Sequence, residues 1–173
     1  GNLTSPANPI SKEVLIEHTL TGDLHAFVWN KLFRRRMLDE NSIKSPENLS
    51  VMQDIPFILD IFSKVNYGFY IPESLYFFRR HSLSNTLKYN PDKFKCLIEI
   101  LHKKIVTMRN MSVGNRKLEL RIYGWFIQGV IDTMIAEIAI PYTGLRDKRL
   151  NEIMNNSLVQ ESIRRAKVRS PYL

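Results

Sequence analysis

Three phrases in the first half of the chain decide how its fold is interpreted. They read VWNKLFRRRML (Val28–Leu38), SVMQDIPFILDIF (Ser50–Phe62) and IPESLYFFRRHSLSNT (Ile71–Thr86). Each phrase combines apolar residues that a core would use with polar residues that a core does not need. The phrases therefore indicate a folded region that also carries a site.

The second phrase has the clearest helical pattern. We expect a helix that begins at Ser50, because Asp54 and Pro56 are both well tolerated near a first turn and apolar residues then recur at helical spacing. The polar turn Asn66–Gly68 ends this helix. Its apolar positions are Phe57, Ile58, Ile61, Phe62 and Val65.

The first and third phrases have partial strand character. Val28, Trp29 and Phe33 favour a strand, and Arg34–Leu38 favours a helical turn after it. The region of the third phrase is rich in aromatic residues but contains a proline, which interrupts a strand. It predicts two short strand pieces followed by a polar loop, at Phe69–Ile71, Ser74–Arg80 and His81–Asn90.

The rest of the chain is predicted to be mostly helical. Ser11 can cap a first helix, and apolar residues recur at helical spacing through much of the second half. We assign no regular structure to the basic tail Gln160–Leu173. The expected helices cover residues 11–20, residues 91–110, Lys117–Ile140 and about Lys148–Asn156.

The expected fold class is α+β and mainly helical. Residues 1–90 form a mixed part and residues 91–173 a helical part, which we treat as two domains. The opening GNLTSPANP is rich in Pro, Asn, Ser and Thr and reads as a linker. We therefore expect the chain to be a piece of a longer protein.

Positive charge is concentrated in the second half of the chain. The net charge is +8 over 173 residues; residues 1–90 carry ten Lys and Arg against nine Asp and Glu, and residues 91–173 carry fifteen against eight. A basic surplus of +7 suits an anionic partner such as a membrane surface, nucleic acid or phosphate. It is equally compatible with a solvated basic surface that has no partner.

Composition excludes several classes of protein. An apolar fraction of 44% argues against disorder. Cys96 is the only cysteine, so an intramolecular disulfide and a cysteine-based metal site are excluded, and we expect Cys96 to be a small buried hydrophobe. No apolar run approaches the roughly 20 residues of a membrane span.

Asp54 is the first candidate for chemistry. The chain has no phosphate-binding GxxxxGK[ST] or GxGxxG loop, no HExxH and no GxSxG, so a complete nucleotide site is not visible. An ionised carboxylate at a helix N-terminus can act as a general base towards a hydroxyl group. The alternative is that Asp54 is simply a favourable first-turn residue.

Two further candidates flank Asp54 in the sequence. Arg80, His81 and Ser84, which follow an aromatic strand piece, could clamp a diphosphate, although His81 could instead bind a metal or the turn could be merely solvated. The second candidate is the sequence Trp29-Asn30-Lys31. Its amide and amine could bind sugar hydroxyls or phosphate, while Trp29 could equally belong to the core.

Taken together, the three phrases resemble the later half of the catalytic domain of the family 2 inverting glycosyltransferases that build bacterial surface polysaccharides. VWNKLFRRR resembles the family's "W-x-KL-(F/Y)-R-R", QDIPF its "E-D-(I)-x-F", and LYFFRRHSLS its "Y-Y-(F/Y)-R-x-H-x-x-S". They occur in the same order and at similar spacing. The resemblance covers about residues 20–88, roughly 40% of the chain.

The resemblance implies the second half of a GT-A domain, a Rossmann-like α/β fold, followed by a helical C-terminal extension. Asp54 matches the catalytic base, and Arg80 and His81 match positions that meet the donor diphosphate. Gln53 departs from the family's usual Glu, which puts any role of that neighbouring acid in doubt. The donor would be a nucleotide-diphosphate sugar, usually a UDP-sugar.

The same resemblance implies a divalent ion, Mg²⁺ or Mn²⁺, held by a D-x-D element in the earlier half of the domain. No D-x-D occurs in this chain, so we expect the chain by itself to be inactive and to hold no metal. We expect the complete enzyme at the cytoplasmic face of a membrane, acting on a glycan or lipid-linked acceptor. The alternative function is a helical interaction module for an acidic or membrane partner; nucleic acid is not expected.

Overall fold

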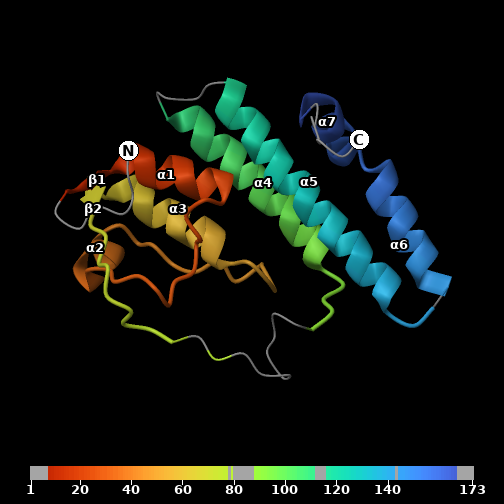
Figure 1. Ribbon diagram of the computed structural model, residues 1–173, viewed down its shortest axis with the longest axis horizontal. Helices are drawn as coiled ribbons and strands as arrows, with labels where there is room; N and C mark the ends of the chain where they lie inside the picture. Colours follow the sequence, from red (N-terminus) through yellow and green to blue (C-terminus); the bar gives the residue numbers. More distant parts are fainter. Residues whose placement is uncertain (1–7, 78, 80–87, 112–115, 143, 167–173) are drawn as a thin grey trace.

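The computed structural model describes residues 8–77, 79, 88–111, 116–142 and 144–166. Within these residues the protein is mainly helical, as the sequence predicts, with seven helices and a sheet of two short strands. Two long helices, α4 (Lys93–Asn110) and α5 (Arg116–Ala139), lie side by side in the middle of the molecule (Figure 1). Helices α1, α3, α6 and α7 pack against this pair.

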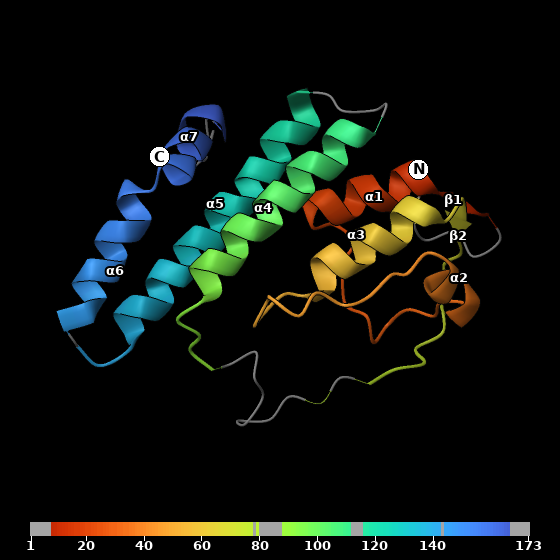
Figure 2. The same ribbon diagram turned by 180° about the vertical axis from the view of Figure 1, so that it is seen from behind.

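Helices from the two ends of the chain cover opposite sides of the α4–α5 pair. Figures 1 and 2 show α1 and α3 on one side and α6 and α7 on the other. The small helix α2 lies at the outer edge, near the two strands. Their bounds are α1 Lys12–Thr21, α2 Arg35–Glu40, α3 Asp54–Lys64, α6 Gly144–Asn155 and α7 Ser157–Ala166.

Local chemistry explains where α1 begins and ends. The Ser11 hydroxyl accepts a hydrogen bond from the Val14 N–H at 3.4 Å, as the predicted N-cap requires. At the other end Gly22 adopts a φ of 84° and its N–H donates to the Thr19 carbonyl. A residue with a Cβ is strained in this left-handed conformation, so Gly22 is suited to direct the chain away from α1.

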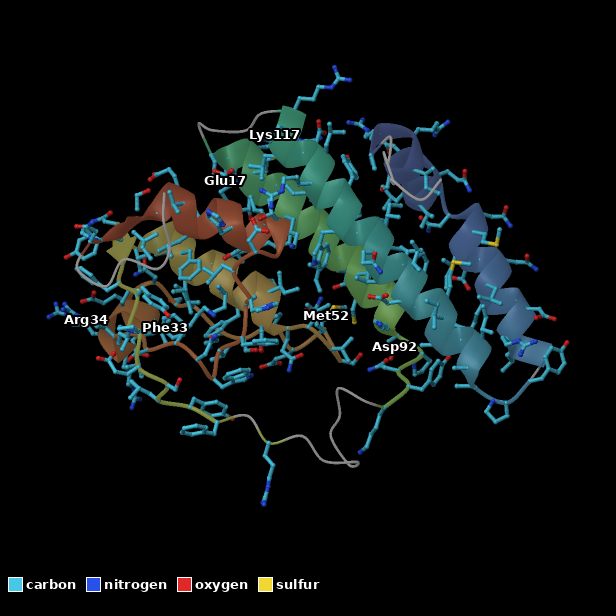
Figure 3. The ribbon with its side chains drawn as sticks, in the orientation of Figure 1. Glu17, Phe33, Arg34, Met52, Asp92 and Lys117 are labelled. Carbon is cyan, nitrogen blue, oxygen red and sulfur yellow. The ribbon has the colours of Figure 1, made fainter. Side chains whose placement is uncertain are left out.

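Helix α3 begins at Asp54 and not at Ser50, so the predicted start was wrong. Met52 has a φ of 59°, which a right-handed helix cannot contain. The Ile55 N–H then donates to the Met52 carbonyl and starts the helix. Figure 3 shows Met52 in the loop just before α3. Asp54 is therefore the first residue of the helix, and Pro56 lies within its first turn, where both are well tolerated.

One hydrophobic core joins the parts that we treated as two domains. Buried residues of α1 and α3, such as Leu20 and Ile58, belong to the same cluster as Phe126 of α5 and Leu97 of α4. Gly129 allows α4 to approach α5 closely, because a Cβ there would lie 2.7 Å from Leu97 Cδ2. Cys96 is buried, as predicted, in a small neighbouring cluster.

The predicted strands are only partly present among the described residues. The sheet consists of β1 (Ile10–Ser11) paired antiparallel with β2 (Tyr67–Gly68), with Ile10 opposite Gly68. The pieces predicted at residues 28–33 and 69–77 are not strands, and residue 79 lies outside any strand as well. Residues 69–77 run as an extended trace along one edge of the molecule (Figures 1 and 2).

The first of these segments nevertheless has the alternation of a strand. Leu24, Ala26 and Val28 pack against the core, whereas His25 and Phe27 between them are exposed. Period-2 alternation is the pattern of a strand with one buried face. Among the described residues no other segment forms backbone hydrogen bonds with it as a neighbouring strand. The strand propensity of its residues is therefore not enough to make this segment a strand.

Two predictions about the C-terminal helices were also inexact. The helix expected at about Lys148–Asn156 begins earlier, at Gly144. The tail, to which we assigned no regular structure, forms α7 up to Ala166. Helix α7 buries Val159 and Ser162 and packs along α5. Charged residues dominate this part of the sequence, and only one of the two buried residues, Val159, is apolar.

We predict that Phe126→Ala lowers the free energy of unfolding by about 3–5 kcal/mol, because Phe126 is fully buried in the hydrophobic core and its removal leaves a cavity. Ile135→Ala on the same helix is the matched control. Ile135 is 59% exposed, so its loss should cost about 0.5 kcal/mol or less. Urea denaturation of both variants measures the difference, and equal losses would contradict this account of the core.

Candidate functional site

The three phrases of the sequence come together at one side of the molecule. Aromatic rings form the contact between the first and third phrases: the rings of Trp29 and Tyr76 are stacked, with centroids 4.7 Å apart. The stack continues to Phe27, 4.9 Å from Trp29, and to His25, 5.2 Å from Phe27. We call His25, Phe27, Trp29 and Tyr76 the aromatic ladder.

The ladder follows from the alternation of the first segment. Residues 25, 27 and 29 lie on the same side of an extended chain, so their rings are adjacent, and Tyr76 adds a fourth ring from a segment about 50 residues away in sequence. Offset stacking of this kind stabilises a pair by about 0.5–1.5 kcal/mol beyond the area that it buries. The ladder therefore holds the two extended segments together without backbone pairing between them.

Lys31 closes the loop that carries the ladder. Its Nζ donates to the carbonyl oxygens of His25 at 2.6 Å and Phe27 at 2.8 Å, and to Asn30 Oδ1 at 2.7 Å. An ammonium group has three protons to donate, and these three acceptors use all of them. Two of the acceptors belong to the backbone of ladder residues, so Lys31 fixes the ladder directly.

Asp54 lies within electrostatic range of Lys31. Burial lowers the pKa of Lys31 to about 8, and the negative charge of Asp54 acts in the opposite direction by raising it. This coupling links the second phrase to the first. Asp54 is partly exposed at the start of α3, where its carboxylate oxygens can reach solvent or a bound hydroxyl group.

The other predicted site residues differ in their exposure and contacts. Gln53 is exposed and its side chain makes no capping hydrogen bond to α3, while the Asn30 amide oxygen is used by Lys31. Trp29 is 38% exposed and belongs to the ladder, not to the core. Arg80, His81 and Ser84 lie outside the described residues, so their predicted role stays a prediction.

Sequence reasoning missed His25, Phe27 and Tyr76. The signal was present in the alternating aromatic positions 25, 27 and 29, which place three rings on one face of an extended chain. It was overlooked because the segment mixed strand and helix preferences. Figure 3 labels Phe33 and Arg34, which follow this segment in the chain. Phe33 packs against the core and Arg34 is exposed.

The basic tail is partly engaged within the molecule. The Arg165 guanidinium bonds to Glu161 and to Glu119 of α5, and it lies 5.5 Å from the centre of the Tyr123 ring. Neighbouring Arg164 is exposed, while Lys167 and Arg169 lie outside the described residues. At least one of the four tail cations therefore supports the packing of α7 on α5.

Within the described residues there is neither a metal-binding cluster nor a membrane-spanning helix. No three His, Cys, Asp or Glu side chains among them come together in a way that could hold a metal ion. The described helices include none with the length and apolarity needed to cross a bilayer. In the family resemblance the divalent ion is held by the D-x-D element of the earlier half of the domain, and not by residues of this chain.

Comparison of the chain with protein-family models, with curated proteins and with solved structures found no match. The glycosyltransferase resemblance therefore rests on the residues of the three phrases.

We predict that the ladder responds to titration of Lys31. Raising the pH through about 8 removes one of three ammonium protons, so an amine with two donors must serve three acceptors. In a Trp125→Phe background, where Trp29 is the only tryptophan, its emission should change with a midpoint near pH 8. Lys31→Met should abolish this transition. A transition of the same amplitude and midpoint in Lys31→Met would assign it to another group.

Proposed function

We propose that this chain is the acceptor-side part of a family 2 type inverting glycosyltransferase. The complete enzyme moves a sugar from a nucleotide-diphosphate sugar, with a UDP-sugar as the expected donor, to a hydroxyl acceptor in the synthesis of a cell-surface polysaccharide. The observation that carries the proposal is the convergence of the three phrases, because Tyr76 stacks on Trp29 and Lys31 lies in the field of Asp54. A hydrophobic core does not require charged groups such as Lys31 and Asp54 to lie near each other.

In the proposed reaction Asp54 is the general base. Its carboxylate takes the proton of the acceptor hydroxyl as the oxygen attacks the anomeric carbon of the donor sugar. The bond from that carbon to the nucleoside diphosphate breaks on the opposite face, so the configuration inverts. Arg80, His81 and Ser84 are proposed to face the diphosphate and stabilise its developing charge.

The proposal gives Lys31 a supporting role. Its three hydrogen bonds stiffen the loop beside Asp54. A positive charge held in a fixed position near the base can stabilise negative charge during the reaction without first having to move. Trp29, together with the neighbouring ladder rings, would form a wall of the acceptor site. Gln53, exposed at the start of α3, would lie at the edge of that site.

The extended segments also support the proposal. Residues 24–29 alternate between buried and exposed side chains, and residues 69–77 are extended and rich in exposed aromatics. Neither pairs with another strand among the described residues. A GT-A half with parallel strands would supply neighbours for such segments. The same half would carry the D-x-D element and its Mg²⁺ or Mn²⁺, which would neutralise charge on the diphosphate.

We place the complete enzyme at the cytoplasmic face of a membrane, where lipid-linked acceptors are found. The surplus of +7 in residues 91–173 would attract an anionic leaflet, at about 1 kcal/mol for each basic residue close to the surface. Arg165 contributes less than its sequence indicated, because it is committed to Glu119 and Glu161.

The alternative function is a helical interaction module. An isoleucine stripe on α5 favours it: Ile131, Ile135 and Ile138 recur at helical spacing and are 44–59% exposed. The sequence encoded upstream of Gly1 discriminates between the two. A βαβ half ending in D-x-D supports the enzyme, and an unrelated domain supports the module.

The experiment that tests the enzyme uses the complete protein encoded by the gene. Release of nucleoside diphosphate from a panel of UDP-sugars is measured with a membrane extract as the source of acceptor. We predict that Asp54→Asn lowers kcat by roughly 10²-fold or more, because the amide cannot accept the proton, while donor affinity stays nearly unchanged.

Asp60→Asn is the matched control. Asp60 is also a partly exposed aspartate of α3, but its carboxylate is paired with Lys103. It should leave turnover near the wild-type value. Equal turnover of wild type and Asp54→Asn would remove Asp54 as the base. Complete absence of transfer with every UDP-sugar in wild type would overturn the proposed UDP-sugar activity.

A further inference from the structure

The isoleucine stripe of α5 extends beyond its three most exposed members. Ile127, half-buried at the margin of the core, continues it towards the start of the helix. A Cβ built on Gly124 would meet no other atom within 4 Å, so the surface is open there. Helices α1, α4, α6 and α7 all contact α5 and leave this face exposed. We call Gly124, Ile127, Ile131, Ile135 and Ile138 the α5 stripe.

The spacing of the α5 stripe is symmetrical about Ile131. Ile127 and Ile135 lie four residues from Ile131 on either side, and Gly124 and Ile138 lie seven residues from it. Steps of three and four residues keep side chains on one face of a helix, and coiled-coil helices use this repeat at their contact. A stripe with this symmetry is complementary to itself when a second α5 packs on it in the opposite direction.

The charge around the α5 stripe disfavours an anionic partner. The chain has a net charge of +8, yet Ile122–Ala139 contains no Lys or Arg. Helices that lie on a membrane surface flank their apolar face with cations, and α5 has none there. Of the two acidic residues in this range, Glu137 is buried and paired with Arg149, and Asp132 accepts a hydrogen bond from Gln128. The α5 stripe therefore fits another apolar helix better than an anionic surface.

We propose that the α5 stripe is the interface of a homodimer, in which α5 of one copy packs antiparallel on α5 of the other around a two-fold axis at Ile131. In this arrangement Ile131 meets its own counterpart, and Ile127 faces Ile135 of the other copy. Gly124 faces Ile138 of the other copy, and because glycine has no side chain there is room for that isoleucine. The inference rests on α5 and does not depend on the proposed glycosyltransferase activity.

Charge selects the antiparallel orientation. Arg116 and Lys117 are exposed in the first turn of α5, and Arg121 follows in the next turn, paired with Asp23. Antiparallel packing places this basic end beside the C-terminal end of the other α5, whose last backbone carbonyl groups carry a partial negative charge. Parallel packing would instead bring the two basic ends together.

A contact through one helix face makes a weak dimer. A standard protein interface uses about 20–30 residues on each side, and the α5 stripe has far fewer. The dimer should therefore form only at high protein concentration. At the low micromolar concentrations of spectroscopy the chain should be largely monomeric.

Sedimentation velocity of the 173-residue chain, which has a continuous core of its own, tests the dimer. We predict that the sedimentation coefficient rises from that of a monomer towards that of a dimer as the concentration is increased to about 0.5 mM. Ile131→Asp places two like charges next to each other at the two-fold axis. It should raise the dissociation constant of the dimer about tenfold or more.

Val106→Asp is the matched control, because Val106 is a similarly exposed β-branched residue, 52% exposed, on α4 and outside the α5 stripe. It should dimerise as the wild type does. Circular dichroism checks that both variants keep their helix content. A wild type that stays monomeric at the highest concentration, or an equal effect of the two substitutions, would overturn the proposal.

Disulfide crosslinking tests the orientation. Cys96 is buried, so it does not compete with a cysteine introduced at the surface. Ile131→Cys should give a covalent dimer when diamide is added as the oxidant, because the two sulfur atoms meet at the axis. Lys117→Cys should not, since antiparallel packing holds the two copies of this position at opposite ends of the interface. Equal crosslinking of both variants overturns the antiparallel arrangement. Should Ile131→Asp fail to fold, the absence of crosslinking in Ile131→Cys overturns the dimer itself.

Vesicles of phosphatidylcholine and phosphatidylglycerol test the other occupant of the α5 stripe. We expect Ile131→Asp and Val106→Asp to bind these vesicles to the same extent as the wild type. Binding that is lost in Ile131→Asp and kept in Val106→Asp would assign the α5 stripe to a membrane surface and overturn the homodimer.

Discussion

The close approach of α4 and α5 is the constraint on which the rest of the structure depends. A methyl group at position 129 would lie 2.7 Å from Leu97 Cδ2, so glycine at this point lets two long helices meet with little space between them. Four other helices, α1, α3, α6 and α7, pack against this pair. Helices α1 and α3 bury their apolar faces on one side of it, and α6 and α7 cover α5 on the other.

Because the same pair supports both ends of the chain, the core is continuous across the boundary that composition suggested at residue 90. Lys104 is an extreme case of this continuity. A residue of the helical part caps the first helix of the mixed part, with Trp125 beneath it. Interior packing of proteins resists small changes of volume, so a shift of α1 is transmitted to α4 and α5.

Helices were predicted from the sequence much better than the extended segments. Periodic apolar residues identified α1, α3, α4 and α5 to within a few residues, because a helix satisfies its backbone groups within one segment. A strand needs a partner, and the sequence of one segment does not contain the partner. Residues 24–29 have the correct alternation and form no strand among the described residues, so the prediction failed for lack of a neighbour. Met52 similarly changed the start of α3 through its own backbone conformation.

The sequence singled out Trp29, Lys31 and Asp54 of the candidate site, and it did not single out His25, Phe27 or Tyr76. Lys31 and Asp54 were singled out as residues that a core would not need, and the structure brings their charges into range of each other. The ladder depends on Tyr76 reaching Trp29 across the fold, which no local pattern specifies. Arg80, His81 and Ser84 remain sequence predictions, since they lie outside the described residues.

The extended segment at residues 69–77 has a consequence for handling the chain in isolation. It exposes Phe69, Leu75 and Phe77, the last at 85%, on backbone whose N–H and C=O groups make no backbone hydrogen bond within the described residues. Open edges of this kind recruit further chains and promote aggregation. Pro72 and the exposed charge of Glu73 interrupt the segment, as gatekeeper residues do in natural sheets. Beyond these two residues the segment still exposes Leu75 and Phe77, so it is the part of the described surface most prone to edge-to-edge association between copies of the chain.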